Sequence, residues 1–312
     1  MKVSILVPVY GVEKYIAECA ESLFSQTYGE IEYIFCDDCT PDGSMEVLRG
    51  VMEKHPERKE HVTLLRNESN SGLGYTRKRL TEALQTDYFM IVDSDDKLPL
   101  DAVEKLVEGM KKNDTDVVSG AYCEFANGKK GKTKMPAKRS REDFQRLLLC
   151  QNVISNPVWG RLFKAKVLSD VKDLFLKGID YSEDFCAMAR LCAVASFSSI
   201  DDEVYCYRTD NISSYTNNIK EKDLLSYLRA SRGVLDFYHQ RGHLPMSLEI
   251  GLIAAYRLCR RHGFPTQKAD DILEYVPEHF SAQILLSMFR SKSIPLFLAD
   301  RLYRIKRLLT CL

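Results

Sequence analysis

The sequence lacks any apolar run that approaches the ~18 residues needed for a transmembrane helix, and its hydrophobic start, 1–8, is too short for a signal peptide. It also lacks net charge. The 44 basic and 44 acidic residues balance, so no overall field favours nucleic acid as a partner. We therefore expect a cytoplasmic protein that does not bind nucleic acid.

Convincing sites for soft metals or thiol chemistry are also lacking. In a cytoplasmic chain, the ten cysteines are expected to be free thiols. Cys36 and Cys39 form a Cys-x-x-Cys pair, but no second pair completes a four-thiolate zinc site. No obvious helix start after Cys36 would lower its pKa. His239 and His243 lie four residues apart, but nearby glycine and proline interrupt any helix there. We expect no metal at either pair.

What the chain does contain is a regular alternation of strand and helix. The predicted strands cover 3–9, 31–36, 62–65, 88–92 and 116–122, and the predicted helices cover 13–26, 43–54, 70–84 and 100–112. Such short spacings suit only crossover units, which predict an α/β fold with a mostly parallel sheet and helices on both faces. Right-handed crossovers follow from that arrangement.

The second half of the chain is expected to be less regular. The basic stretch 127–141 predicts a mobile surface loop, with an acceptor or phosphate contact as the alternative. Short strands at 196–200 and 203–208 predict a hairpin. Trp159, the only tryptophan, suits either core packing or a platform for a sugar ring. From 220 onward the pattern is helical, so we expect a helical region over 216–312 after a larger domain over 1–215.

Three carboxylates, Asp93, Asp95 and Asp96, directly follow the apolar strand 88–92. Ligands of open α/β sheets bind beyond the carboxyl ends of the strands. Carboxylates this close repel one another unless they are solvated or share a hard divalent cation such as Mg²⁺ or Mn²⁺. A solvated acidic turn that caps the next helix is the other interpretation.

Two further loops are expected at the same edge of the sheet. They are the turn at 8–11 after the first strand and Asp37 with Asp38 after the second. All three loops can therefore meet in one crevice. Later in the chain, Glu183 and Asp184 follow Ser182, a plausible N-cap, and their charges suit the positive end of a helix dipole. That capping role is the structural alternative to a catalytic one.

The final stretch, 290–312, differs from the rest. It carries six basic residues against one acid, with leucine, isoleucine and phenylalanine between them. A basic amphipathic helix of this kind can lie at an anionic membrane surface, which here would be the cytoplasmic face of the inner membrane. A terminal helix packed on the body of the protein is the equal alternative.

Several motifs together resemble the inverting glycosyltransferases of family 2, which have the GT-A fold. They are, in chain order, Val3–Tyr10; Ser25-Gln26-Thr27-Tyr28; Asp37-Asp38-Cys39-Thr40-Pro41-Asp42; Asn70–Lys78; the acidic Asp93–Asp96; 156–164; Ser182-Glu183-Asp184-Phe185; and Tyr205-Cys206-Tyr207-Arg208 with Ser213-Ser214. Gly11, Cys39, Thr76 and Lys78 depart from the family's Asn, Gly, Ala and Asn. Together the motifs cover 1–122 strongly, 150–215 moderately and nothing beyond.

The resemblance implies a Rossmann-like GT-A domain over 1–215, with a nucleotide-sugar half at 1–122 and an acceptor half at 123–215. It implies a UDP-sugar donor and a divalent metal, Mn²⁺ or Mg²⁺, held by Asp95 with Asp93 and Asp96. Asp38 would accept the uracil N–H, and Arg77 would face the donor. The implied donor-binding residues are Pro8, Tyr10, Asp38, Arg77, Asp93, Ser94 and Asp95.

The resemblance also implies that Asp184 is the base that deprotonates the acceptor hydroxyl, with Glu183 as its local rival. The acceptor would be a glycan or lipid-linked glycan in cell-surface polysaccharide biosynthesis. One alternative is a non-catalytic protein of the same fold that binds a nucleotide sugar or scaffolds a membrane complex. A phospho-acceptor signalling domain and a thiol enzyme using Cys36 and Cys39 fit less well.

Overall fold

The computed structural model describes residues 1–135, 145–146, 148–150, 157–211, 220–242, 244–291 and 293–311. Ser213, Ser214, His243 and the basic segment 136–141 lie outside the described residues, as does position 156. The chain divides into two compact units. The first comprises 1–138, 157–180 and 194–217, and the second comprises 139–156, 181–193 and 218–312. The sequence predicts one domain over 1–215, whereas in the structure two segments within that range, 139–156 and 181–193, group with the helical unit.

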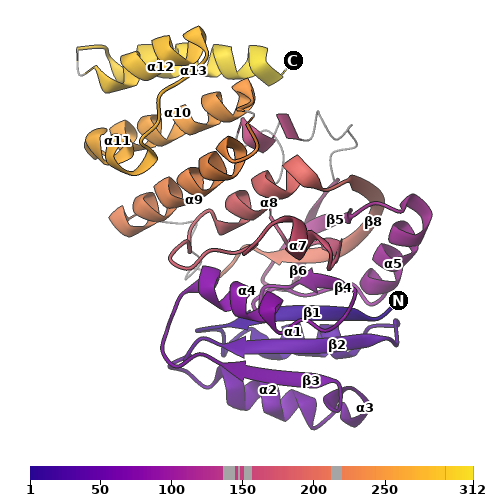
Figure 1. Ribbon diagram of the computed structural model, residues 1–312. Helices are drawn as coiled ribbons and strands as arrows, with labels where there is room; N and C mark the ends of the chain where they lie inside the picture. Colours follow the sequence, from indigo (N-terminus) through magenta and orange to yellow (C-terminus); the bar gives the residue numbers. More distant parts are fainter. Residues whose placement is uncertain are drawn as a thin grey trace. The chain divides into compact units, whose positions relative to one another are not determined.

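The first unit is built on a mixed sheet (Figure 1). Its strands are β1 (Val3–Val9), β2 (Ile31–Asp37), β3 (Val62–Arg66), β4 (Tyr88–Ile91), β5 (Val117–Ala126), β6 (Lys129–Lys134), β7 (Arg161–Lys164) and β8 (Phe197–Arg208). Parallel pairs join β3 to β2, β2 to β1, β1 to β4 and β5 to β8, whereas β7 and β6 run antiparallel to their neighbours. The predicted, mostly parallel α/β sheet is confirmed.

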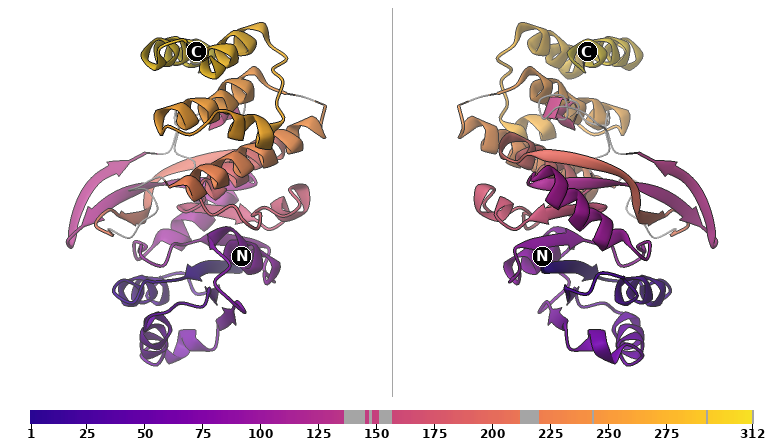
Figure 2. Two further views of the ribbon diagram at one scale, coloured as in Figure 1. Left: turned by 90° about the vertical axis from the view of Figure 1, so that its left-hand side faces the viewer. Right: turned by 90° about the vertical axis from the view of Figure 1, so that its right-hand side faces the viewer.

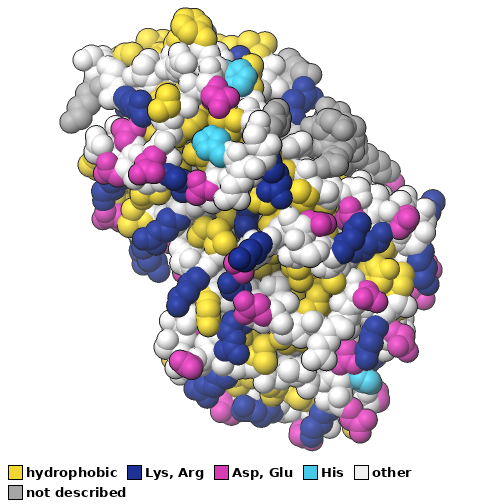
Figure 3. Space-filling view, viewed as in Figure 1, with side chains coloured by type: hydrophobic (Ala, Val, Ile, Leu, Met, Phe, Trp, Pro, Cys, Tyr) yellow, Lys and Arg dark blue, Asp and Glu magenta, His cyan; other side chains and the backbone are white. Residues whose placement is uncertain are grey.

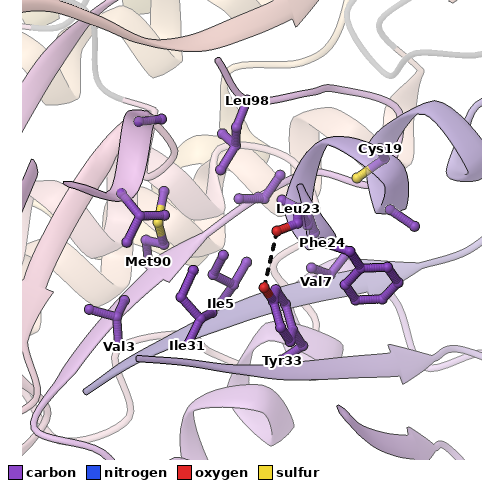
Figure 4. Packing of buried hydrophobic residues seen from close by; sticks show 14 of the residues in the cluster. Val3, Ile5, Val7, Cys19, Leu23, Phe24, Ile31, Tyr33, Met90 and Leu98 are labelled. Carbon is purple, nitrogen blue, oxygen red and sulfur yellow. Dashed lines mark hydrogen bonds between the residues drawn. The ribbon is translucent and has the colours of Figure 1, made fainter. Parts of the chain in front are cut away.

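Both faces of the sheet are covered by helices. The helices of this unit are α1 (Ile16–Phe24), α2 (Ser44–Met52), α3 (Pro56–Lys59), α4 (Leu73–Glu82), α5 (Ala102–Asn113) and α7 (Val167–Asp170). All seven residues of β1 are buried, which requires cover on both sides because successive side chains alternate between faces. Val3, Ile5 and Val7 point into the cluster shared with α1, α2 and α5, where the Tyr33 hydroxyl donates to the Leu23 carbonyl (Figure 4).

Two expectations about the second half of the sheet are wrong. Lys129–Lys134 forms a strand, β6, paired antiparallel with β5, although all six of its residues are exposed. The stretches 196–200 and 203–208 form no hairpin: they belong to one strand, β8, which runs parallel to β5 with register shifts near Ala121. Figure 2 shows β5 with β6 and β8 extending together. Cross-strand pairing, which composition does not reveal, decided both segments.

The second unit is helical, as expected. Its helices are α8 (Glu183–Val194), α9 (Glu221–His239), α10 (Met246–Arg261), α11 (Gln267–Leu273), α12 (Phe280–Arg290) and α13 (Leu296–Cys311). The last residue of α8, Val194, is assigned to the first unit. Contacts join α10 to α9, α12 and α13, and α11 to α9. Within the described residues, no helix is long and apolar enough to span a bilayer.

Candidate functional site

The carboxyl ends of β2, β1 and β4 lie side by side, as predicted. In the parallel register Val9 pairs with Asp37, and Leu6 pairs with Ile91. The backbone N–H of Asp38 donates to the Val9 carbonyl at 3.0 Å, and that of Val92 donates to the Leu6 carbonyl at 3.0 Å. The turn after β1, the loop after β2 and the acidic loop after β4 therefore share one edge of the sheet.

Asp42 ties the first two loops together. Its carboxylate accepts the backbone N–H of Glu13 at 3.0 Å, the Thr40 hydroxyl at 2.7 Å and the Ser44 hydroxyl at 2.5 Å. The Thr40 hydroxyl in turn accepts the Gly11 N–H at 2.8 Å. Burial alone would raise the pKa of Asp42, but the hydrogen bonds from Ser44, Thr40 and the backbone lower it to about 2.

Cys39 takes the place of the family's glycine in a left-handed backbone conformation, with φ at 53°. A side chain there costs ~1–2 kcal/mol relative to glycine. Its Sγ lies 3.0 Å from the Asn67 carbonyl oxygen, a contact that glycine cannot make. The substitution therefore keeps the turn and adds a link to the segment after β3.

Asp38 organises that segment. Its Oδ1 accepts the Asn67 side-chain amide at 2.6 Å and the Ser71 N–H at 2.8 Å, and its Oδ2 accepts the Gly72 N–H at 2.9 Å. Asn67, which the sequence did not single out, is a buried hub that also donates to the Thr76 hydroxyl at 3.0 Å. A carboxylate has about four acceptor positions, so Asp38 retains capacity for one further donor.

Asp96 anchors the acidic loop to β8. Its Oδ2 accepts the Tyr205 hydroxyl at 2.7 Å, and its Oδ1 accepts the Arg208 backbone N–H at 2.7 Å. Tyr205 also accepts the backbone N–H of Asp93 at 3.1 Å. Asp96 is 1% exposed, and burial, followed by the charges of Asp95 and Asp93, raises its pKa well above the usual range. The resemblance implies Asp96 as a metal residue, and in this structure both of its oxygens accept hydrogen bonds from β8 that hold the loop in place.

Asp95 and Asp93 are the more accessible carboxylates of the loop. The Asn211 side-chain amide donates to Asp95 at 2.8 Å. Burial, followed by the charge of Asp93, raises the pKa of Asp95. The carboxylate of Asp93 pairs with the guanidinium of Arg77 at 2.7 Å. Because Arg77 is 1% exposed, it acts on the loop through Asp93.

Arg208 connects the acidic loop to α1. Its Nε donates to the Asp95 carbonyl at 2.7 Å, its guanidinium pairs with Glu18, and it lies over the rings of Tyr15 and Phe125. The motif at 205–208 was the only sequence signal for this role. Trp159 stacks on Tyr205 with ring centroids 4.4 Å apart and is 9% exposed, so it packs in the core beneath the loop.

The remaining donor-side residues differ in access. Tyr10 is 46% exposed at the end of β1, Ser94 is 6% exposed, and Pro8 is buried within β1. Tyr10 is thus the residue of these three that can contact a ligand from solvent.

The donor set of the acidic loop suits a hard cation, since Mg²⁺ and Mn²⁺ prefer carboxylate oxygen. Burial is the main reason that the pKa of Asp95 is raised, and the neighbouring charge of Asp93, which a cation would offset, adds to it. In the part of the chain that the structure describes, however, the three loop carboxylates do not place one oxygen each within 4.8 Å of the other two. The described residues that do bring their ligand atoms this close together are Cys123, Glu203 and Cys206. The loop therefore fits a metal held by one or two of its carboxylates together with ligand oxygens.

The start of α4 packs closely against the chain before α8. The Gly74 N–H donates to the Asp180 carboxylate at 3.1 Å, and a Cβ at Gly74 would lie 2.2 Å from the Ile179 carbonyl oxygen. Gly72 has a φ of +86°, and its Cβ would lie 2.3 Å from Asp180. Both glycines belong to the motif Asn70–Lys78, but no sequence motif pointed to Asp180 as their partner.

Asp184 lies in the second unit, in the first turn of α8. Glu183 beside it is 9% exposed, and Ser182 before them has a φ of 66°. The Cys186 N–H donates to the Ser182 carbonyl at 3.0 Å. Asp184 is the less buried acid of the pair.

Comparison with known proteins agrees with the motifs. Residues 4–172 match the family model described as glycosyl transferase family 2. The chain is 32% identical over 123 residues to the glycosyltransferase GlyG of Streptococcus pneumoniae, covering 39% of this chain and 40% of GlyG. It is 31% identical over 210 residues to the poly(ribitol-phosphate) beta-glucosyltransferase of Bacillus spizizenii, covering 66% of this chain and 32% of that protein. The matches therefore span less than half of these relatives.

Solved structures support the fold. TarS of S. aureus, residues 1–349 in complex with UDP-GlcNAc, superposes with a TM-score of 0.65 and 17% sequence identity. The match covers 100% of this chain and 89% of that one. At this identity the likeness concerns the fold, and it confirms the expected GT-A architecture with a helical carboxyl-terminal region.

Proposed function

Because the chain belongs to glycosyl transferase family 2, we propose that it transfers a sugar from a UDP-sugar to a hydroxyl of a glycan or lipid-linked glycan, with inversion at the anomeric carbon. The observation that carries the proposal is the acidic loop Asp93–Asp96, held at the shared edge of the sheet by Tyr205 and Arg208. The setting in cell-surface polysaccharide biosynthesis accords with the poly(ribitol-phosphate) beta-glucosyltransferase relative.

On the donor side, Tyr10 would cover the nucleoside, and Asp38 would use its remaining acceptor capacity for the uracil N–H. Asp42 and Thr40 keep the turn around Tyr10 in place. Pro8 would close the base pocket from within β1. Ser94 would lie near the ribose together with Asp93.

The donor diphosphate gains negative charge as it leaves. A divalent cation bound at Asp95, with Asp93 beside it, would act as a Lewis acid on that leaving group. Arg77 fixes Asp93, and Asn211 fixes one oxygen of Asp95. Asp96 keeps both in position through β8. Arg77 is thus proposed to position Asp93 and to balance the charge of the loop.

On the acceptor side, Asp184 would take the proton of the attacking hydroxyl. Inversion needs one base and no covalent nucleophile. A positioned base contributes typically ~10²–10⁴-fold to the rate. Glu183 is the more buried acid of the pair, which leaves Asp184 as the better candidate.

The test is UDP release from a panel of UDP-sugars, with and without acceptor glycans. We expect Asp184→Asn to lower kcat ~10²–10⁴-fold, Asp95→Ala to abolish turnover and EDTA to abolish wild-type activity. Asp202→Asn, which alters a half-exposed surface carboxylate, should leave activity unchanged. Wild-type turnover of a folded Asp184→Asn variant would remove Asp184 from the base role, and full activity in EDTA would exclude the metal.

We also propose that α13 contacts an anionic membrane surface. Ala299 and Tyr303 are buried on one side of the helix, where the Phe289 ring meets Tyr303 and Arg257 pairs with Asp300. An adjacent side exposes four apolar residues, which are Leu298 (43%), Leu302 (41%), Ile305 (46%) and Leu309 (64%). Hydrophobic side chains gather over α12 and α13 in Figure 3. By helical spacing, Arg301 and Lys306 flank this face, as an interfacial helix requires.

A further inference from the structure

Two thiols and a carboxylate come together where β5 lies between β6 and β8. Cys123 of β5 and Cys206 of β8 are directly paired in the parallel register, and their Sγ atoms lie 3.2 Å apart. Glu203 lies earlier on β8, opposite Ala121. One ligand atom from each of Cys123, Glu203 and Cys206 lies within 4.8 Å of the other two. The donor and acceptor roles proposed above use none of these side chains.

The spacing of the sulfur atoms suits a shared metal ion. Two thiolates on one tetrahedral zinc, with Zn–S bonds of ~2.3 Å, lie about 3.8 Å apart. A disulfide would draw them to ~2.05 Å. The observed 3.2 Å needs only a small opening for a metal, and the nearby carboxylate supplies a third ligand. We propose that Cys123, Cys206 and Glu203 bind a divalent cation of the zinc class, with water as the fourth ligand.

Binding would release protons. Burial raises the pKa of Cys123, and burial raises the pKa of Cys206 to about 12, so both thiols are neutral at pH 7 without a cation. Metal binding forms two S–metal bonds and one O–metal bond, and both thiol protons leave to solvent. Affinity should therefore rise with pH, by up to ~100-fold per pH unit when two protons are released. Raised pKa values also make these thiols poor nucleophiles, which disfavours a role in redox chemistry.

Charged neighbours modulate this site from two elements. Lys130 on β6 pairs with Glu203 at 2.8 Å, and the Thr133 hydroxyl donates to Glu203 at 3.0 Å. On the other side, the charge of Lys97 lowers the pKa of Cys206 by a smaller amount than burial raises it. The Lys130 ammonium competes with a cation for Glu203. Its side chain is 60% exposed, so it can swing into solvent when a metal binds.

The site would brace the strand that holds the acidic loop. The Cys206 N–H donates to the Lys97 carbonyl at 2.9 Å, and the Lys97 N–H donates to the Cys206 carbonyl at 3.2 Å. Tyr205 and Arg208, on either side of Cys206, anchor Asp96. A metal joining β5 to β8 at Cys206 therefore stiffens β8 where it meets that loop.

The experiment titrates reduced, metal-free full-length protein with Zn²⁺ and with Cd²⁺, which reports thiolate ligands by ultraviolet charge-transfer absorption. We expect one equivalent with a sulfur band and a higher Tm in the presence of Zn²⁺. The side chains of the acidic loop offer only oxygen ligands, and Cys19, whose Sγ lies 3.8 Å from the Asp93 carbonyl oxygen, is fully buried. We therefore expect no sulfur band from that loop, and a failure of glycosyl transfer would not affect this readout.

The variants are expected to change metal binding in opposite directions. Cys123→Ser and Cys206→Ser should each lose the sulfur band, and Glu203→Gln should weaken binding at least tenfold. Lys130→Gln should tighten binding, because it removes the competing cation. Cys259→Ser, at a buried thiol of α10, is the matched control and should behave as wild type.

Several results would overturn the proposal. They are the absence of a sulfur band in wild type, a band that persists in the Cys123→Ser/Cys206→Ser double variant, and weaker binding by Lys130→Gln. A Cys123–Cys206 disulfide that forms in air at the same rate with and without Zn²⁺ would also overturn it. If a cysteine variant does not fold by circular dichroism, Glu203→Gln and Lys130→Gln still decide the outcome.

Discussion

At the scale of single residues, one buried carboxylate sets the form of the acidic loop. Asp96 accepts two hydrogen bonds from β8, which lets Asp95 and Asp93 remain accessible beside it. Of the three clustered aspartates, Asp96 is thus the buried anchor, and Asp93 and Asp95 are the more accessible ones. Their spacing in sequence does not distinguish them. The distinction comes from Tyr205 and Arg208, more than a hundred residues later in the chain.

Removing the Tyr205 hydroxyl should loosen this loop. Tyr205→Phe leaves Oδ2 of Asp96 and the backbone N–H of Asp93 without a buried partner, which costs ~1–3 kcal/mol. Urea denaturation should show that loss, and the KM for the UDP-sugar should rise. Tyr122→Phe, on another ring packed against Trp159, is the control and should change neither quantity. Equal stability of the two variants would contradict the anchoring role.

Asp42 predicts a pH dependence of stability. Its folded-state pKa, about 2, lies below the ~3.9 of an ordinary aspartate. The stabilisation is therefore complete above pH ~4 and is lost as pH falls from ~4 towards ~2. Asp42→Asn should be less stable than wild type at pH 7, and the difference should narrow below pH 4 in urea titrations. A difference that is constant from pH 7 to pH 2 would exclude this linkage.

At the scale of elements, the sequence pattern identified the strands and helices up to β4 apart from the short helix α3, which buries no residue. Most of the identified elements bury the apolar face that their pattern requires. The pattern failed for β6 and β8. Lys129–Lys134 has no apolar face and is held as a strand by pairing with β5. The gap expected at 201–202 is bridged because β8 continues along β5. Edge and register effects of this kind depend on partners distant in sequence.

The start of α4 offers a matched pair of glycine substitutions. Gly74→Ala places a Cβ 2.2 Å from the Ile179 backbone oxygen, and such overpacking costs ~1–3 kcal/mol or more. Gly50→Ala in α2 meets nothing within 4 Å and should stabilise the protein by up to ~1 kcal/mol. Opposite shifts of Tm are expected. If Gly74→Ala has the same Tm as wild type, the backbone of 176–180 moves away from the new Cβ without a cost in stability, and the prediction is wrong.

At the scale of the whole molecule, the chain forms two compact units whose segments alternate along the sequence. Asp184 belongs to the helical unit, although it precedes the end of β8 by more than twenty residues. For the final stretch the sequence left two interpretations, a helix at a membrane surface and a helix packed on the protein. They are compatible, since α13 packs on α10 and α12 with one side. An adjacent side stays apolar and exposed.

Membrane contact through α13 is testable on vesicles. Leu302→Glu with Ile305→Glu should lower co-sedimentation with phosphatidylglycerol-containing vesicles at least tenfold, since burial of each leucine or isoleucine contributes ~1.5–3 kcal/mol. Leu100→Glu changes a leucine of the first unit that is 59% exposed and should bind as wild type. Binding should also weaken as salt rises. Equal binding by all three proteins would exclude the α13 face.

The sequence by itself determined the alternating α/β pattern, the edge of the sheet where three loops meet, and the family. Those features are local: periodicity fixes which residues are buried, and parallel strands place their carboxyl ends together. Only the tertiary structure decided that Asp96 anchors the loop, that Asp38 holds Asn67 and Gly72, and that Cys123 faces Cys206. Such roles depend on burial and on hydrogen bonds between residues far apart in the chain, which local pattern cannot encode.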